Sequence, residues 1–292
     1  MGLRRLVVGA ALLGLAPQLP VLESAAAEPI PFRPTGGWTA DFADESCALE
    51  RTFSNGTDTL SLRLRQFAPG DAFEITVASP TLGRWRVRRI AFTAAGARQD
   101  IEQFQTFEVP GGLKGAIFHA SLPSMRPRGE PPPNADFATY TAAAELDRLH
   151  IGGLYRSPID IEMGTLGAAM RTMETCLDDL LAYWGLDAQA HRTLTRRAEP
   201  DWSEAWIALT APMQRDFLAK KHSTRQDVRL IIDETGKPTG CSVTGWPDDE
   251  PIARRMCDAL LKEAHIPPAL DNRSQPIKSY FVLVLTAIAR SG

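Results

Sequence analysis

The sequence predicts an α+β protein, in which an N-terminal antiparallel β domain with a packed helix precedes a small ββαβ domain. Apolar and polar residues alternate in short runs between Trp38 and Asp160, as in strands with one buried face. Residues 166–184 repeat apolar side chains at three- and four-residue steps, the spacing of an amphipathic helix. Residues 228–285 then follow the order strand, turn, strand, helix, strand.

The first residues predict an export signal. Two arginines precede an apolar run from Leu6 to Leu15, and a row of three alanines ends at Ala27, which is a typical cleavage site. An uncleaved anchor is the alternative. However, the run is short and is followed by Pro17 and Pro20, whereas a span needs about twenty apolar residues. We therefore expect residues 1–27 to be a cleaved signal peptide and the protein to be released into the periplasm.

Charge gives no support for binding to nucleic acid or to an anionic membrane. The formal net charge of the whole chain is −3, and removing residues 1–27 takes away two arginines and one glutamate, which leaves −4. Such mild acidity does not attract polyanions. We expect no nucleic-acid partner and, after signal cleavage, no membrane span.

The alternating runs define the N-terminal domain. Residues 28–37 are rich in proline and glycine and predict a short extended leader. Residues 38–195 are the predicted β-rich domain, in which many short strands favour an antiparallel sandwich or barrel, and the helix over 166–184 closes it. Residues 196–212, with Pro200, are a predicted linker, and residues 213–292 form the last domain.

The last domain has a clear order of elements. A strand over 228–233 leads into a turn in which Gly236 is expected to take a positive φ. A second strand over 239–246, a helix with apolar residues from Ile252 to Ala264, and a closing strand from Tyr280 to Leu285 follow.

This order resembles the C-terminal domain of TonB. The motifs that carry the resemblance are a "D-x-x-G" turn at 233–236, Ile266-Pro267-Pro268-Ala269 in place of "F-x-P-A", and Ser274-Gln275-Pro276-Ile277 in place of "G-x-P-V". An early "E-S-C-x-L-x-R-x-F" and a "C-x-x-x-L-x-x-x-W-G-x-D" over 176–187 extend the similarity to nearly the whole mature chain. With these motifs the chain resembles exported alphaproteobacterial proteins that are often labelled TonB energy transducers.

The resemblance implies a way of binding partners. TonB-like domains bind extended segments of outer-membrane transporters by adding a strand to a sheet edge, and the edge implied here is the closing strand, around Tyr280, Val282 and Val284. The alternative is that this strand is central and buried, since both of its faces are apolar. The chain departs from the family in having Ala211 where an aromatic residue is expected, no long proline- and lysine-rich spacer, and no histidine in the first apolar run. We therefore expect a non-enzymatic envelope protein-interaction or structural module, the alternative being a TonB-type energy transducer that binds outer-membrane transporters.

Four cysteines in an exported chain predict two disulfides. We favour Cys241–Cys257, because the second strand and the apolar face of the helix packed across it carry these residues. In the exported proteins that the chain resembles, the TonB-like part carries the corresponding cysteine pair. Cys47–Cys176 is the pair that remains, and it would tie the first strand of the β domain to its last helix. Free buried thiols and a zinc site are the alternatives.

No motif of a known catalytic, metal or cofactor site is present. Glu145, Asp147 and His150 are close in sequence, but we interpret them as a solvated face. Asp248, Asp249 and Glu250 precede a helix and are interpreted as capping residues. The remaining histidines are scattered singly, at 119, 191, 222 and 265. The sequence thus predicts no enzyme activity, no cofactor and no metal ligand.

Overall fold

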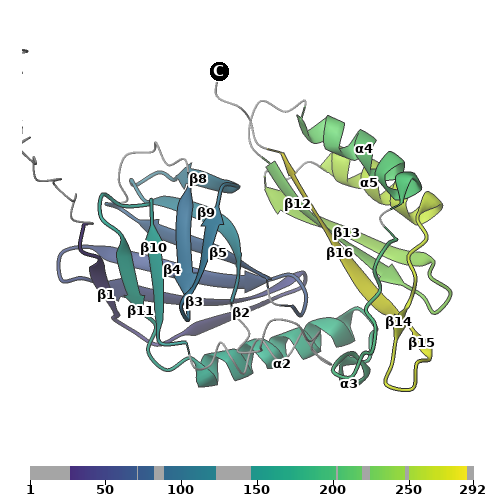
Figure 1. Cartoon of the computed structure of the whole chain (residues 1–292), viewed down its shortest axis with the longest axis horizontal. Helices are drawn as coiled ribbons and strands as arrows, with labels where there is room; N and C mark the ends of the chain where they lie inside the picture. The colour runs from purple at the N-terminus through teal and green to yellow at the C-terminus, as the bar shows by residue number, and fades with distance from the viewer. Residues whose placement is uncertain are drawn as a thin grey trace, which may run out of the picture.

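The computed structural model describes residues 27–70, 72–81, 89–122, 146–201, 203–218, 224–246 and 250–287 (Figure 1). The predicted signal peptide, except for Ala27, lies outside the described residues, and so do Glu145, Asp248 and Asp249. Two separate hydrophobic cores divide the described chain. We call residues 27–191 the barrel unit and residues 194–287 the C-terminal unit.

One large sheet forms the barrel unit, with the strand order β7-β6-β10-β11-β1-β3-β4-β5-β9-β8, and β2 pairs with β3 outside this path. Its strands are β1 (Ile30–Pro34), β2 (Thr39–Ala43), β3 (Ser46–Ser54), β4 (Thr59–Gln66), β5 (Ala72–Ser79), β6 (Ile90–Ala94), β7 (Ala97–Ile101), β8 (Phe104–Glu108), β9 (Lys114–Ser121), β10 (Arg148–Gly152) and β11 (Ile159–Glu162). Two hydrogen bonds between Gln99 of β7, the first strand in this order, and Ser121 of β9, the last but one, bring the two ends of the sheet together. The sheet is therefore nearly closed, as a barrel is.

The predicted α+β class is wrong. The chain is mostly β, with 45% strands and few helices, and its main feature is the large barrel-like sheet. The sequence pattern identified short strands but not how many of them join one continuous sheet. In particular, β1 lies within the predicted leader and pairs in parallel with β11 and antiparallel with β3, so this proline-rich segment joins the two halves of the sheet.

Helix α2 (Gly167–Tyr183) lies along one end of the barrel unit (Figure 1). It forms because apolar residues recur along one stripe, and this stripe, including Met170, Met173 and Leu177, is buried. Gly185, with φ of 72°, ends the helix in the left-handed conformation that favours glycine. A disulfide between Cys47 of β3 and Cys176 ties α2 to the sheet. The short helix α3 (Ala188–His191) follows.

The C-terminal unit contains a three-stranded sheet in the order β13-β12-β16. Its elements are α4 (Glu204–Leu218), β12 (Thr224–Ile232), β13 (Pro238–Trp246), α5 (Glu250–Glu263), β14 (Ala269–Leu270), β15 (Pro276–Ile277) and β16 (Ser279–Ala287). Gly236 in the β12–β13 turn has φ of 89°, as expected. Both α4 and α5 lie on the face of the sheet that is turned away from the barrel unit (Figure 1). A second disulfide joins Cys241 of β13 to Cys257 of α5.

The two disulfides are the pairs favoured from the sequence, and no cysteine is free. Disulfides form and persist in oxidising compartments, so the pairs indicate an extracytoplasmic environment. In the described residues, no helix is both long and apolar enough to cross a membrane.

Candidate partner-binding cleft

Direct contacts hold the two units together along β16. The hydroxyl of Tyr280 donates to the backbone oxygen of Pro69, at 3.1 Å. The Tyr280 ring stacks on the ring of His191 and meets the edge of Trp184. These contacts bring the loop after β4, the end of α2 and α3 against one end of β16.

His191 and Ser279 are buried polar residues at this contact, and each has 2% of its surface exposed. The Nδ1 of His191 lies 2.7 Å from the backbone oxygen of Asp187, and its Nε2 lies 3.0 Å from the hydroxyl of Ser279. Because a carbonyl oxygen only accepts, Nδ1 carries the proton and Nε2 accepts from Ser279. Burial lowers the pKa of His191 from the ordinary value of 6.5, so the neutral ring is favoured in the folded protein.

A second contact between the units involves Arg229 of β12. Its guanidinium carbon lies 3.9 Å from the centre of the Trp184 ring, and it forms an ion pair with Glu45 of the β2–β3 turn. The Arg229 side chain is mostly buried, which strengthens the attraction between a cation and an aromatic face. This contact fixes β12 of one unit against α2 of the other.

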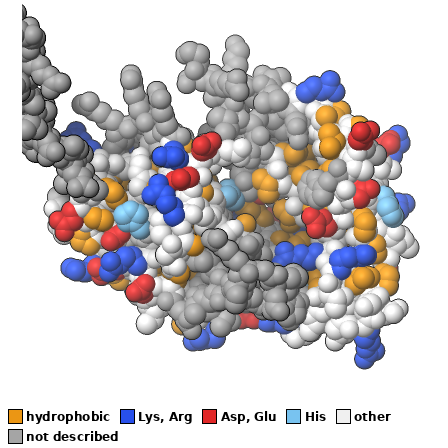
Figure 2. Space-filling model, in the orientation of Figure 1, with side chains coloured by type: hydrophobic (Ala, Val, Ile, Leu, Met, Phe, Trp, Pro, Cys, Tyr) orange, Lys and Arg blue, Asp and Glu red, His pale blue; other side chains and the backbone are white. Residues whose placement is uncertain are grey.

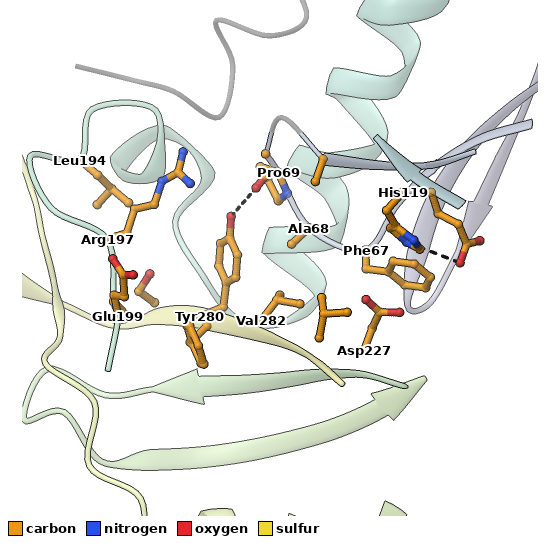
Figure 3. Close-up of a pocket in the computed structure, with 17 residues that line it drawn as sticks. Phe67, Ala68, Pro69, His119, Leu194, Arg197, Glu199, Asp227, Tyr280 and Val282 are labelled. Atoms are coloured by element: carbon orange, nitrogen blue, oxygen red, sulfur yellow. Dashed lines mark hydrogen bonds and ion pairs between the residues drawn. The ribbon is translucent and has the colours of Figure 1, made fainter. Parts of the chain in front are cut away.

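A cleft of about 340 Å³ lies between the units, within the range of ligand-binding pockets. One wall is β16, the opposite wall is formed by residues 67–70, Ala72, Glu74 and His119, and Leu194 with residues 197–199 closes one side. Figure 3 shows Tyr280, Val282 and Asp227 on one side of this space and Phe67, Ala68 and Pro69 on the other. In the space-filling view, hydrophobic side chains gather between the two units (Figure 2).

The direction of the backbone groups of β16 follows from the hairpin that precedes it. Asp233 N–H donates to Lys237 O at 2.9 Å, so Asp233 faces β13. Alternate residues of a strand direct their backbone groups to opposite sides, and those of β12 that face β16 are therefore Ile232, Leu230, Val228 and Gln226. Their partners in the antiparallel register are Ser279, Phe281, Leu283 and Leu285. The N–H and C=O groups of Tyr280, Val282 and Val284 consequently point away from β12.

The side chains of these three residues also share one face of β16. Phe281, Leu283 and Leu285 are buried in the core of the C-terminal unit, whereas Tyr280 and Val282 are half-buried and Val284 is 44% exposed. Among the described strands, β16 is the last in its sheet and pairs only with β12. The residues predicted as a partner-binding edge thus line the cleft at the end of the sheet.

Other residues singled out from the sequence lie away from this cleft. His150 of β10 forms a hydrogen bond of 2.7 Å with Asp160 of β11, on the barrel unit. Glu250 is the first residue of α5. His265 is exposed after α5, beside the turn at Gly236.

The structure also gathers three residues that the sequence did not connect. Glu74 of β5, His119 of β9 and Asp227 of β12 each offer one ligand atom, and these atoms lie within 4.8 Å of one another. All three residues line the cleft. They are far apart in the sequence, so no spacing motif signals them.

No family model matches the chain, and neither a curated protein nor a solved structure matches it. The resemblance to TonB-type domains therefore rests on the sequence motifs alone.

Proposed function

We propose that the protein is a non-enzymatic periplasmic interaction module that binds an extended segment of an envelope protein at the outer edge of β16. The observation that carries the proposal is that β16 is the last described strand of its sheet, and that Tyr280, Val282 and Val284, whose backbone groups point away from β12, line the cleft. Added strands gain affinity from main-chain hydrogen bonds and specificity from pockets for alternate side chains.

The lining of the cleft suggests what such a segment contains. Val282, Leu194 and Ala198 supply apolar side chains, whereas Arg197, Glu199 and Asp227 introduce both signs of charge. A segment with alternating small apolar side chains and few charges fits this lining. A short segment suits the volume of about 340 Å³.

The alternative is a TonB-type energy transducer, in which the segment bound belongs to an outer-membrane transporter. The resemblance of the last domain to TonB supports it. The replacement of the family's aromatic residue by Ala211 and the missing spacer weigh against it. Both functions use the same edge, so the identity of the partner separates them.

Site-specific photocrosslinking in the producing bacterium tests the proposal. A photoreactive amino acid at Val284, which is 44% exposed on the edge, should capture an envelope protein. The matched control is Ile207, an exposed apolar residue of α4, the helix on the face of the sheet turned away from the barrel unit (Figure 1). A transporter captured at Val284 supports the transducer, and a lipoprotein or other envelope protein supports the interaction module.

The variant Val282→Pro adds a second criterion. Proline removes one N–H from the outer edge while leaving the groups that face β12 in place. We expect the Val284 crosslink to disappear while the circular dichroism spectrum is unchanged. Crosslinking at Ile207 alone, or a Val284 product that persists in the folded proline variant, would contradict the proposal.

A further inference from the structure

The two units contribute to one cluster of metal-ligating side chains. Glu74 and His119 are directly opposite each other in the β5–β9 register, and Asp227 reaches them from β12 of the C-terminal unit. Both carboxylates are buried, with 7% of Glu74 and 6% of Asp227 exposed, and His119 is half-buried. Figure 3 shows His119 and Asp227 at the same end of the cleft.

The distance between the Glu74 carboxylate and the His119 ring suits two ligands of one ion better than a direct hydrogen bond between the two side chains. Arg65 forms an ion pair with Oε1 of Glu74, while Oε2 lies 3.8 Å from Nε2 of His119. That separation is too long for a hydrogen bond. Two ligands at about 2.0–2.1 Å from a tetrahedral zinc ion lie about 3.3 Å apart, so a small movement of either side chain would bring both to one ion.

The charges favour a cation at the same place. Glu74 and Asp227 bring two carboxylates from different units to within 4.8 Å of each other. Removing such groups from water while they repel each other is unfavourable. Arg65 forms an ion pair with Glu74, and a divalent cation held by all three ligands would offset charge on both carboxylates.

We propose that Glu74, His119 and Asp227 bind a zinc ion that joins the barrel unit to the C-terminal unit. Imidazole nitrogen combined with carboxylate oxygen suits zinc, whereas calcium and magnesium take oxygen ligands. Three protein ligands would leave a fourth position for water or a ligand, and all three residues line the cleft. The inference goes beyond the proposed function and does not depend on a bound segment.

Calorimetric titration of the chelator-treated protein with Zn²⁺ alone tests the site. We expect one ion per chain. Loss of an outer partner of a metal ligand weakens metal binding about 10–100-fold, so loss of a direct ligand in His119→Asn or Asp227→Asn should weaken it by at least about a hundredfold. The matched control is His150→Asn, which disrupts another histidine–aspartate pair, 2.7 Å apart, outside the cleft. Its affinity should be unchanged.

Cobalt substitution gives a readout that a simple charge network would not produce. Co²⁺ at this site should show the visible absorption bands of low-coordinate cobalt, and Zn²⁺ should displace it. Absence of both zinc binding and cobalt bands in the folded wild-type protein would overturn the inference. Binding that is equally strong in both cleft variants would overturn it too. If one variant fails to fold, the other variant and the wild-type cobalt spectrum still show whether the three residues bind a metal ion.

The outcomes separate this inference from the proposed function. A protein that captures a partner through Val284 but binds no zinc refutes the metal site alone. A protein that binds zinc through the three ligands but captures no partner at Val284 refutes only the proposed partner binding at the outer edge of β16. Crosslinking with and without a chelator shows whether the ion is needed to keep the cleft in shape.

Discussion

The two disulfides should contribute unequally to stability, because they close loops of different length. Cys47–Cys176 spans 129 residues and Cys241–Cys257 spans 16. In the chain-entropy description, the longer loop restrains the unfolded chain by about 5 kcal/mol and the shorter one by about 3 kcal/mol. The free energy of unfolding should therefore fall by about 2 kcal/mol more when the longer link is lost.

Two double variants test this difference, Cys47→Ala with Cys176→Ala, and Cys241→Ala with Cys257→Ala. Urea unfolding followed by circular dichroism gives the free energy of unfolding of each. Thiol titration of the unreduced, denatured wild-type protein is the control and should find no free thiol, since every cysteine is paired. Equal losses, or a larger loss for the shorter loop, would refute the entropic argument. Free thiols in the wild-type protein would refute the pairing itself.

Three other substitutions test the contacts around the cleft and the hairpin. Arg229→Gln removes the cation–aromatic contact with Trp184 and should destabilise the contact between the two units by about 2 kcal/mol. Faster amide hydrogen exchange in β12 and β16 measures this loss. Burial lowers the pKa of His191 below 6.5, so the unfolded chain takes up the proton first as the pH drops, and stability should fall below pH 6.5. The urea midpoint of His191→Asn should therefore depend less on pH than that of the wild-type protein. Equal slopes of midpoint against pH in the two proteins would contradict this. Gly236→Ala places a side chain at φ of 89° and 2.7 Å from a backbone oxygen, which should cost about 1–3 kcal/mol in urea unfolding, whereas Gly37→Ala, with nothing within 4 Å, should cost much less.

Local patterns predicted single elements well. The apolar stripe over 166–184 corresponds to α2, and the alternating region between Trp38 and Asp160 contains β4 and β5. The turn at Gly236 and the two cysteine pairs also agree with the structure. These features depend on residues close in sequence or on the pairing of very few candidates.

Long-range pairings could not be predicted in the same way. In β1, Ile30 pairs in parallel with Ile159, and the prolines of this strand suggested a leader instead. Helix α4 begins inside the predicted linker and contains Pro212, a residue that usually marks a break. No local periodicity reports either the closure of the sheet or the strand count that makes the chain mostly β.

The sequence predicted the residues of only one wall of the cleft. The closing strand gave Tyr280, Val282 and Val284 through the resemblance to TonB. The opposite wall and the cluster of Glu74, His119 and Asp227 arise from packing between the two units. Single polar residues in separate strands carry no signal until the register of those strands is known.

Amide hydrogen exchange along β16, measured by NMR with and without the segment captured at Val284, tests strand addition most directly. The amides of Val282 and Val284 point away from β12, while those of Phe281, Leu283 and Leu285 belong to the ladder with β12. We predict that the segment slows exchange at Val282 and Val284 and leaves the intervening amides nearly unchanged. Uniform slowing along β16, or protection confined to amides outside β16, would contradict binding at this edge.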